Sequence, residues 1–252
     1  MPFVDRFTKH RATSKRDSND FIKAGDGDII FQEQFKTFRS KIEYKLDVMG
    51  WTVIGITSTI AGEGKTFICA KIAESLALTK RKKVLVVDAD IRKADLSKGL
   101  FKTKPPGLTE ILSGEATLQQ VTRQTGVPGL EAISAGEEVT QHADLLAGAR
   151  FRTFIAAARQ GYDIVILDTP PVLAVADTLS MREHLDGFVF VYRAGFTPIS
   201  MFQQATEEIG EKKILGVVLN GVERRSEKYY SHYYGSYYVD SKKIGNANRV
   251  SR

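Results

Sequence analysis

A short segment, Ala61–Thr66 (AGEGKT), carries the residue types that phosphate binding requires. Its two glycines let the backbone curl so that amide N–H groups face phosphate oxygens. The lysine can reach the β- and γ-phosphates of a nucleotide, and the threonine hydroxyl can ligate Mg²⁺. The strict phosphate-loop pattern has glycine at position 59, where this chain has threonine, so a fortuitous glycine turn is the alternative interpretation. We assign nucleotide binding to Ala61, Gly62, Glu63, Gly64, Lys65 and Thr66.

Three carboxylates stand at the ends of two apolar runs. Asp88 and Asp90 follow the run VLVV, and Asp168 closes the run IVIL. In an open α/β sheet, ligands bind beyond the carboxyl ends of the strands, where the glycine loop also lies. We therefore expect these carboxylates to converge on the γ-phosphate and its metal, with Thr66, Asp88 and Asp168 as metal ligands. A carboxylate that closes a strand could instead cap the following helix.

The regions that must position these residues alternate between short apolar runs and helical stretches. The runs are apolar on both faces, as strands buried in a parallel sheet are. They are Val53–Thr57, Val84–Asp88, Ile164–Asp168, Phe188–Tyr192 and Ile214–Asn220, with a shorter one at Leu130–Ser134. Helices are expected at Lys65–Lys80, Leu108–Leu112, Ala143–Gln160, Thr178–Leu185 and Ser200–Lys212. This alternation predicts an α/β fold with a doubly wound, mostly parallel sheet of the P-loop NTPase type and helices on both faces.

The composition excludes several classes of protein. The chain has 252 residues, 42% of them hydrophobic, which is enough for one sizeable domain with a buried core. Its longest uncharged stretch, Val48–Gly62, is too short and too polar for a membrane helix, and the N-terminus lacks an apolar secretory core. One cysteine and four scattered histidines predict neither a disulfide framework nor a histidine–cysteine metal site. We expect a cytoplasmic protein.

Both ends of the chain are basic, whereas the middle is close to neutral. Residues 1–24 have a net charge of +3 and residues 223–252 of +4, against +6 for the whole chain. We interpret 1–28 as a mobile basic arm, 29–222 as the P-loop domain and 223–252 as a flexible tail. The basic ends either dock on an acidic surface or are merely solvated. Nucleic acid is not an expected partner, because residues 1–24 lack interleaved base-stacking aromatics.

The tail contains an unusual concentration of tyrosine. The stretch YYSHYYGSYY holds six of the nine tyrosines of the chain and no aliphatic residue. Such density without core periodicity suits a phosphoacceptor segment, although a sticky aromatic tail or a C-terminal strand is the alternative. The six candidate acceptors are Tyr229, Tyr230, Tyr233, Tyr234, Tyr237 and Tyr238.

These motifs together resemble those of bacterial tyrosine autokinases of polysaccharide export, in their separate-chain, cytoplasmic form. The three phosphate-site motifs of that family are similar to Ala61–Thr66, Asp88–Ala94 (DADIRKA) and Leu167–Pro171 (LDTPP). Gly107–Leu112 and Leu215–Asn220 match further family segments, and a tyrosine cluster ends both. The resemblance covers most of the chain, so it makes 29–222 a P-loop kinase domain.

The resemblance implies an ATP- and Mg²⁺-dependent kinase that phosphorylates its own tail in trans within a ring of subunits. It places the catalytic work on Lys65, Asp88, Asp90 and Asp168, with Asp88 as the base and Asp90 in support, although the sequence does not resolve which carboxylate is the base. Asn220 lies where the wider fold class often contacts the adenine. The family's ring motif falls on a helix predicted over 31–46 by the spacing of its phenylalanines. Its residues here are Glu33, Lys36 and Arg39, with lysine in place of an arginine.

The resemblance further implies a membrane-anchored polysaccharide copolymerase that activates the chain at the inner face of the cell membrane, and a counteracting tyrosine phosphatase. Two alternatives remain open. One is a partitioning or division-site ATPase, although such proteins have a signature lysine where this chain has Ile60. The other is an ATP-gated scaffold for the copolymerase that modifies nothing.

Overall fold

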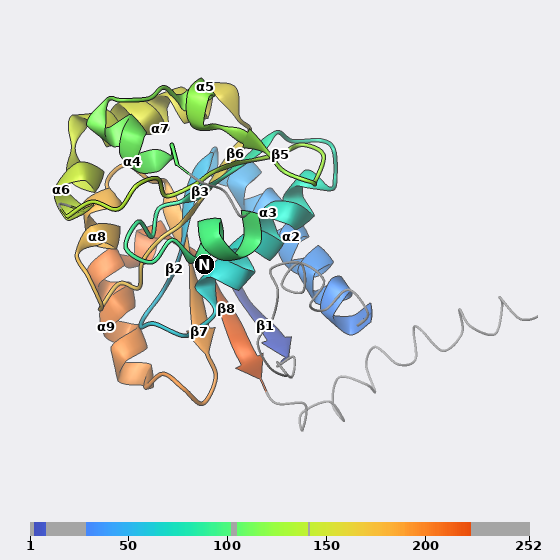
Figure 1. Cartoon of the computed structure of the whole chain (residues 1–252). Coiled ribbons are helices and arrows are strands. Elements are labelled where there is room, and N and C mark those ends of the chain that lie inside the picture. Colours follow the sequence, from blue (N-terminus) through green and yellow to red (C-terminus); the bar gives the residue numbers. More distant parts are fainter. Residues whose placement is uncertain (1–2, 9–28, 102–104, 141, 223–252) are drawn as a thin grey trace, which may run out of the picture.

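The computed structural model describes residues 3–8, 29–101, 105–140 and 142–222, whose strands form one eight-stranded sheet with helices on both faces (Figure 1). The strands are β1 (Phe3–Thr8), β2 (Val53–Ser58), β3 (Val84–Asp88), β4 (Arg123–Gln124), β5 (Leu130–Ile133), β6 (Ile164–Asp168), β7 (Gly187–Arg193) and β8 (Ile214–Val222). The α-helices are α2 (Ile29–Met49), α3 (Lys65–Ala77), α4 (Leu108–Ser113), α5 (Leu118–Val121), α6 (His142–Ala147), α7 (Ala149–Gly161), α8 (Asp177–Met181) and α9 (Ile199–Ile209). The predicted fold class is confirmed.

The strand order, β1-β8-β7-β2-β6-β3-β5-β4, places β2, which leads into the glycine loop, next to β6 and β3, which end in Asp168 and Asp88. Every described pair is parallel except β4 with β5. In the register of the sheet, Asp168 lies opposite Asp88 on one side and Ile56 on the other. The carboxyl ends of β2, β3 and β6 therefore meet at a single edge, as the chemistry of the site requires.

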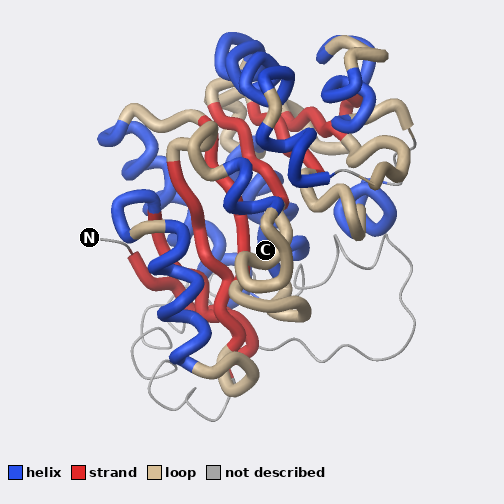
Figure 2. The backbone as a smooth tube through the Cα atoms, turned by 90° about the vertical axis from the view of Figure 1, so that its left-hand side faces the viewer, coloured by secondary structure: helices blue, strands red, loops and turns tan. Residues whose placement is uncertain are grey.

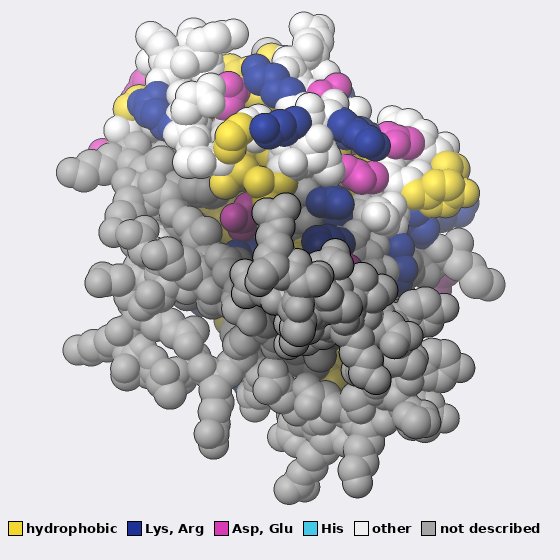
Figure 3. Space-filling model, turned by 90° about the vertical axis from the view of Figure 1, so that its right-hand side faces the viewer, with side chains coloured by type: hydrophobic (Ala, Val, Ile, Leu, Met, Phe, Trp, Pro, Cys, Tyr) yellow, Lys and Arg dark blue, Asp and Glu magenta, His cyan; other side chains and the backbone are white. Residues whose placement is uncertain are grey.

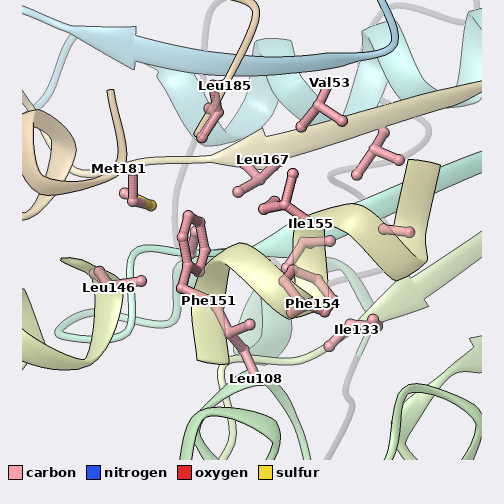
Figure 4. Packing of buried hydrophobic residues seen from close by; sticks show 14 of the residues in the cluster. Val53, Leu108, Ile133, Leu146, Phe151, Phe154, Ile155, Leu167, Met181 and Leu185 are labelled. Carbon is pink, nitrogen blue, oxygen red and sulfur yellow. The ribbon is translucent and has the colours of Figure 1, made fainter. Parts of the chain in front are cut away.

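Helices lie on both faces of the sheet (Figure 2), and two clusters of buried apolar side chains, one on each face, hold the strands in place. Helices α2 and α3 pack on one face, where Ile54 and Ile56 of β2 are fully buried. Helices α4, α7 and α9 pack on the other face, where Phe151 of α7 and Leu167 of β6 belong to one cluster of buried side chains (Figure 4). Because the strands are apolar on both faces, they are rigid supports for the loops at their ends.

Several elements differ from the sequence-based expectation. The helix expected over 143–160 is two helices, α6 and α7, because Gly148 adopts an extended conformation between them. Strand β1 lies within the predicted mobile arm, so that prediction is wrong for residues 3–8, which pair with β8. Main-chain pairing of an edge strand needs no apolar periodicity, and the sequence therefore gave no sign of it. The short elements α5 and β4 were not predicted either.

No helix within the described ranges has both the length and the apolar character needed to cross a membrane. On the face seen in Figure 3, Lys and Arg side chains are interspersed with Asp and Glu side chains. This mixture agrees with the near-neutral charge of the middle of the sequence.

Candidate nucleotide-binding and catalytic site

The glycine loop joins β2 directly to α3, so that the loop curls around the N-terminus of the helix. Gly62 and Gly64 have φ angles of 88° and 91°, a left-handed backbone conformation that residues with a Cβ atom rarely adopt. At Gly64 the space is also restricted, since a Cβ there would lie 2.4 Å from Nδ2 of Asn220. The N–H groups of the first turn of α3 and the curled loop thus form an anion-binding end.

Lys65 lies at the centre of the carboxylate cluster. Its Nζ lies 2.8 Å from Oδ2 of Asp90 and 3.3 Å from Oδ1 of Asp168, and it donates to the Thr66 hydroxyl at 3.2 Å. Burial by itself would lower the pKa of the lysine, but the neighbouring carboxylates outweigh this effect and raise it. Lys65 is therefore a permanent cation, already held where it can meet a phosphate.

The carboxylate of Asp88 is fully buried and is fixed on one side only. Its Oδ2 accepts hydrogen bonds from the main-chain N–H of Ser97 at 2.8 Å and from the Ser97 hydroxyl at 2.5 Å. Burial, followed by the charge of Asp168, raises the pKa of Asp88 to about 7. Burial likewise raises the pKa of Asp168. A carboxyl group with a pKa near neutrality is suited to accept and release a proton.

Two carboxylate oxygens of the site are left without a partner. Oδ1 of Asp88 and Oδ2 of Asp168 are buried and accept no hydrogen bond from any described residue. Buried carboxylate oxygens of this kind require a cation or a donor. With the Thr66 hydroxyl beside them, they offer the hard oxygen ligands that Mg²⁺ prefers together with phosphate and water. The donor set therefore fits Mg²⁺, although the described residues contain no cluster of three or more His, Cys, Asp or Glu arranged to hold a metal unaided.

Glu63 of the glycine loop and Asn220 of β8, both predicted to bind the nucleotide, contact each other. Nδ2 of Asn220 donates to the main-chain oxygen of Glu63 at 2.8 Å. The Glu63 side chain turns inward and the whole residue is only 1% exposed, so its carboxylate is not available to a ligand. Contact of Asn220 with an adenine stays a prediction.

The sequence did not predict the residues that fix Asp88 and the glycine loop in place through hydrogen bonds. Ser97 fixes Asp88 and also accepts from the Ala135 N–H at 2.9 Å, while Arg193 and Thr197 hold the glycine loop through Glu63. No sequence spacing indicates these contacts, since each joins residues that come together only in the folded structure.

The remaining predicted residues lie elsewhere. Glu33 and Lys36 form an ion pair of 2.6 Å within α2, and Arg39 donates to the main-chain oxygen of Ser75 in α3 at 3.2 Å. A role for these three side chains in oligomerisation stays a prediction. The six tail tyrosines, the tail 223–252 and most of the arm 1–28 lie outside the described residues.

A buried lysine at a glycine loop, with aspartates at the ends of adjacent strands, defines a P-loop nucleotide-binding protein. Comparison with known sequences agrees, since a profile of the AAA domain family matches residues 51–184. Tyrosine-protein kinase YwqD of Bacillus subtilis (strain 168) is 32% identical over 203 residues, which cover 80% of this chain and 85% of that protein. The chain belongs to the bacterial tyrosine-protein kinase family.

A solved structure has a similar fold. The crystal structure of the chimerical protein CapA2B2 aligns with a TM-score of 0.77 at 26% identity, covering 88% of this chain and 95% of that one. Other relatives are much longer. Tyrosine-protein kinase ptk of Acinetobacter johnsonii is 31% identical over 217 residues, which cover 85% of this chain but only 30% of that protein. The chain thus spans less than a third of the length of such relatives.

Proposed function

We propose that the chain is an ATP- and Mg²⁺-dependent protein-tyrosine autokinase whose acceptors are the tyrosines of segment 229–238. The observation that carries this proposal is the arrangement of Lys65, Thr66 and the three aspartates at one edge of the sheet. These residues neutralise charge and position a phosphoryl group, which are the main requirements of phosphoryl transfer. Family membership adds the acceptor class, since the matched relatives are named tyrosine-protein kinases.

Each residue of the site has a definite task in this reaction. Lys65 binds the β- and γ-phosphate oxygens, and the curled loop holds the phosphates through its N–H groups. Thr66, Asp88 and Asp168 would hold Mg²⁺, which when bound offsets negative charge on the phosphate oxygens. A bond forms between the phenolic oxygen and the γ-phosphorus while the bond to the β–γ bridging oxygen breaks, and ADP leaves. A carboxylate near the attacking oxygen accepts the phenolic proton, and the family resemblance assigns this task to Asp88, with Asp90 in support.

The start of the tail is consistent with this chemistry. Strand β8 ends at Val222, two residues after Asn220, whose amide contacts the glycine loop. The tail therefore begins at the same edge of the sheet as the phosphate site. The fourteen residues from Asn220 to Tyr234 can span roughly 45–50 Å when extended, so we infer transfer to the tail of a second copy in a ring.

The modified tail would have the opposite charge. Each phosphotyrosine adds about −1.5 to −2 charges, so six would add roughly −9 to −12 to a segment near +4. We infer that this reversal opens the ring, that a tyrosine phosphatase resets it, and that the cycle regulates a membrane-anchored polysaccharide copolymerase. Equal masses of the phosphorylated and dephosphorylated forms in light scattering would contradict the opening of the ring.

Incubation with ATP and Mg²⁺, followed by mass mapping of residues 229–238, tests the function. We expect phosphate on these tyrosines in the wild type and none in Lys65→Met, while an exposed-charge control, Glu207→Gln, behaves as the wild type. ATP turnover to free phosphate with an unmodified tail would instead favour the partitioning-type ATPase. Nucleotide binding without either product would favour the scaffold.

A second experiment tests whether the phosphoryl group is transferred to the tail of the same chain or of a second copy. A Lys65→Ala chain is mixed with a catalytically intact chain that lacks residues 229–238. Label on the tail of the Lys65→Ala chain supports transfer in trans, and its absence refutes it.

A further inference from the structure

The Glu63 side chain makes three hydrogen bonds although it lies in a loop of small residues. Oε2 accepts from the main-chain N–H of Ile60 at 2.9 Å, within the same loop. Oε1 accepts from the main-chain N–H of Arg193 at 3.1 Å and from the Thr197 hydroxyl at 2.6 Å. Glu63 is 1% exposed and Thr197 is 4% exposed, so this group is shielded from water.

The partners of Glu63 demand a carboxylate. Two of them are main-chain N–H groups, one on each side of the carboxylate, and neither can act as an acceptor. A carboxamide in either orientation would turn its NH₂ group toward one of these donors. The carboxylate also gains from charge-assisted bonds, which are about twice as strong as neutral ones. Replacement of Glu63 by the isosteric glutamine is therefore expected to break at least one of these hydrogen bonds.

These bonds join the glycine loop to the segment 193–198, which begins at the last residue of β7. The segment has one further link to the loop, since Nη1 of Arg193 donates to the main-chain oxygen of Gly62 at 2.9 Å. It is also bonded to β8, where the N–H of Ala194 donates to the main-chain oxygen of Asn220 at 2.8 Å. The other side of the glycine loop is held differently. There the N–H of Val172 donates to the oxygen of Ser58 at 2.8 Å, without any contribution from Glu63.

We propose that Glu63 is a positioning residue that locks the glycine loop onto segment 193–198 in the conformation that receives the phosphates of ATP. This inference rests on the proposed function, because it requires the loop to bind a nucleotide. Without the lock, only a fraction of molecules would hold the loop in the binding conformation, and the apparent Kd would rise in inverse proportion to that fraction.

The test measures binding of Mg-ATP to the full chain by calorimetry for Glu63→Gln, Thr197→Val and Thr197→Ser, with Glu207→Gln as the matched exposed control. We expect Glu63→Gln to raise the Kd by about 10-fold or more, because a charge-assisted group is lost and an N–H is left unpaired. Thr197→Val is expected to raise the Kd by a smaller factor, about 3-fold to 10-fold. Thr197→Ser keeps the hydroxyl and should recover most of that loss. At saturating ATP, kcat should change much less than KM, because the chemical groups are intact.

Hydrogen exchange separates positioning from a general loss of structure. In Glu63→Gln the N–H of Arg193 should exchange faster, whereas the N–H of Val172 should keep its wild-type protection. Equal nucleotide affinity in wild type, Glu63→Gln and Thr197→Val would overturn the inference and leave the proposed function intact. Failure of the wild type to bind Mg-ATP would instead overturn the proposed function. Loss of protection at Val172 as well would show a structural role only and would also overturn the inference.

Discussion

Replacing Asp88 by asparagine is expected to stabilise the nucleotide-free protein while it abolishes phosphoryl transfer. In the folded protein this carboxylate is fully buried, close to the charge of Asp168, and only one of its oxygens has a partner, Ser97. The amide oxygen of asparagine can still accept from Ser97, whereas the buried negative charge is removed. Function and stability are thus opposed at this position, as is common for residues of active sites.

The size of the effect follows from the raised pKa of Asp88. A rise from 3.8 to about 7 corresponds to roughly 4 kcal/mol at about 1.4 kcal/mol for each pH unit. Weaker neutral bonds to Ser97 offset part of this, so we expect a net gain of about 2 kcal/mol, or roughly 4–8 °C in Tm for a chain of this size. Because Asp88 stays protonated to a higher pH in the folded state than in the unfolded state, the free energy of unfolding of the wild type falls as the pH rises from about 4 to about 7. The advantage of asparagine is therefore full above about pH 7 and vanishes below about pH 4.

Urea unfolding in the presence of EDTA, at about pH 5 and about pH 8, measures this difference. The matched control is Asp95→Asn, which makes the same chemical change at an exposed position. Added Mg²⁺ should stabilise the wild type more than Asp88→Asn, because the cation relieves the same repulsion. The reasoning would be refuted if Asp88→Asn were no more stable than the wild type at pH 8, or if its advantage were the same at both pH values.

Three further outcomes are expected. Gly64→Ala should lower ATP affinity at least about 10-fold, measured by calorimetry, and lower the free energy of unfolding by about 1–3 kcal/mol, measured by urea unfolding. Both effects are expected because the φ angle of 91° and the nearby amide of Asn220 disfavour a Cβ atom at this position. Phe151→Ala should destabilise the domain by about 3–5 kcal/mol in urea unfolding, because it opens a cavity in the layer under α7, and a loss below about 1 kcal/mol would contradict that packing. Asp177→Asn should cost about 1–3 kcal/mol in the same assay, because Asp177 is fully buried and accepts from Nε and Nη2 of Arg92 at 2.8 and 3.0 Å. A change within about 0.5 kcal/mol would show that this ion pair has little weight.

The site could be predicted from the sequence wherever its residues follow a strand directly. Lys65 comes straight after the glycine loop, and Asp88 and Asp168 end apolar runs, so the carboxyl edge of a parallel sheet brings them together. Ser97 and Thr197 could not be found in this way. They contact Asp88 and Glu63 across 9 and 134 positions of the chain, and hydrogen bonds of this kind leave no periodic pattern.

The elements show the same division. Strands β3 and β6 have the predicted bounds, because buried parallel strands are apolar on both faces and their runs end sharply. The break at Gly148 was missed, since the apolar spacing continues across it into α7. Strand β1 was missed because it pairs with β8 through main-chain N–H and C=O groups. Since every residue type except proline carries both groups, this pairing leaves no pattern in the sequence.

By itself, the sequence determined the alternating α/β order, the position of the glycine loop and the strand-end carboxylates, because each depends on neighbours within a few residues. Only the tertiary structure decided that Asp88 is fixed on one side and has a raised pKa, that Lys65 joins two carboxylates, and that Glu63 faces inward. Burial and electrostatic fields arise from groups that are distant in the chain and close in space, and no local pattern records them.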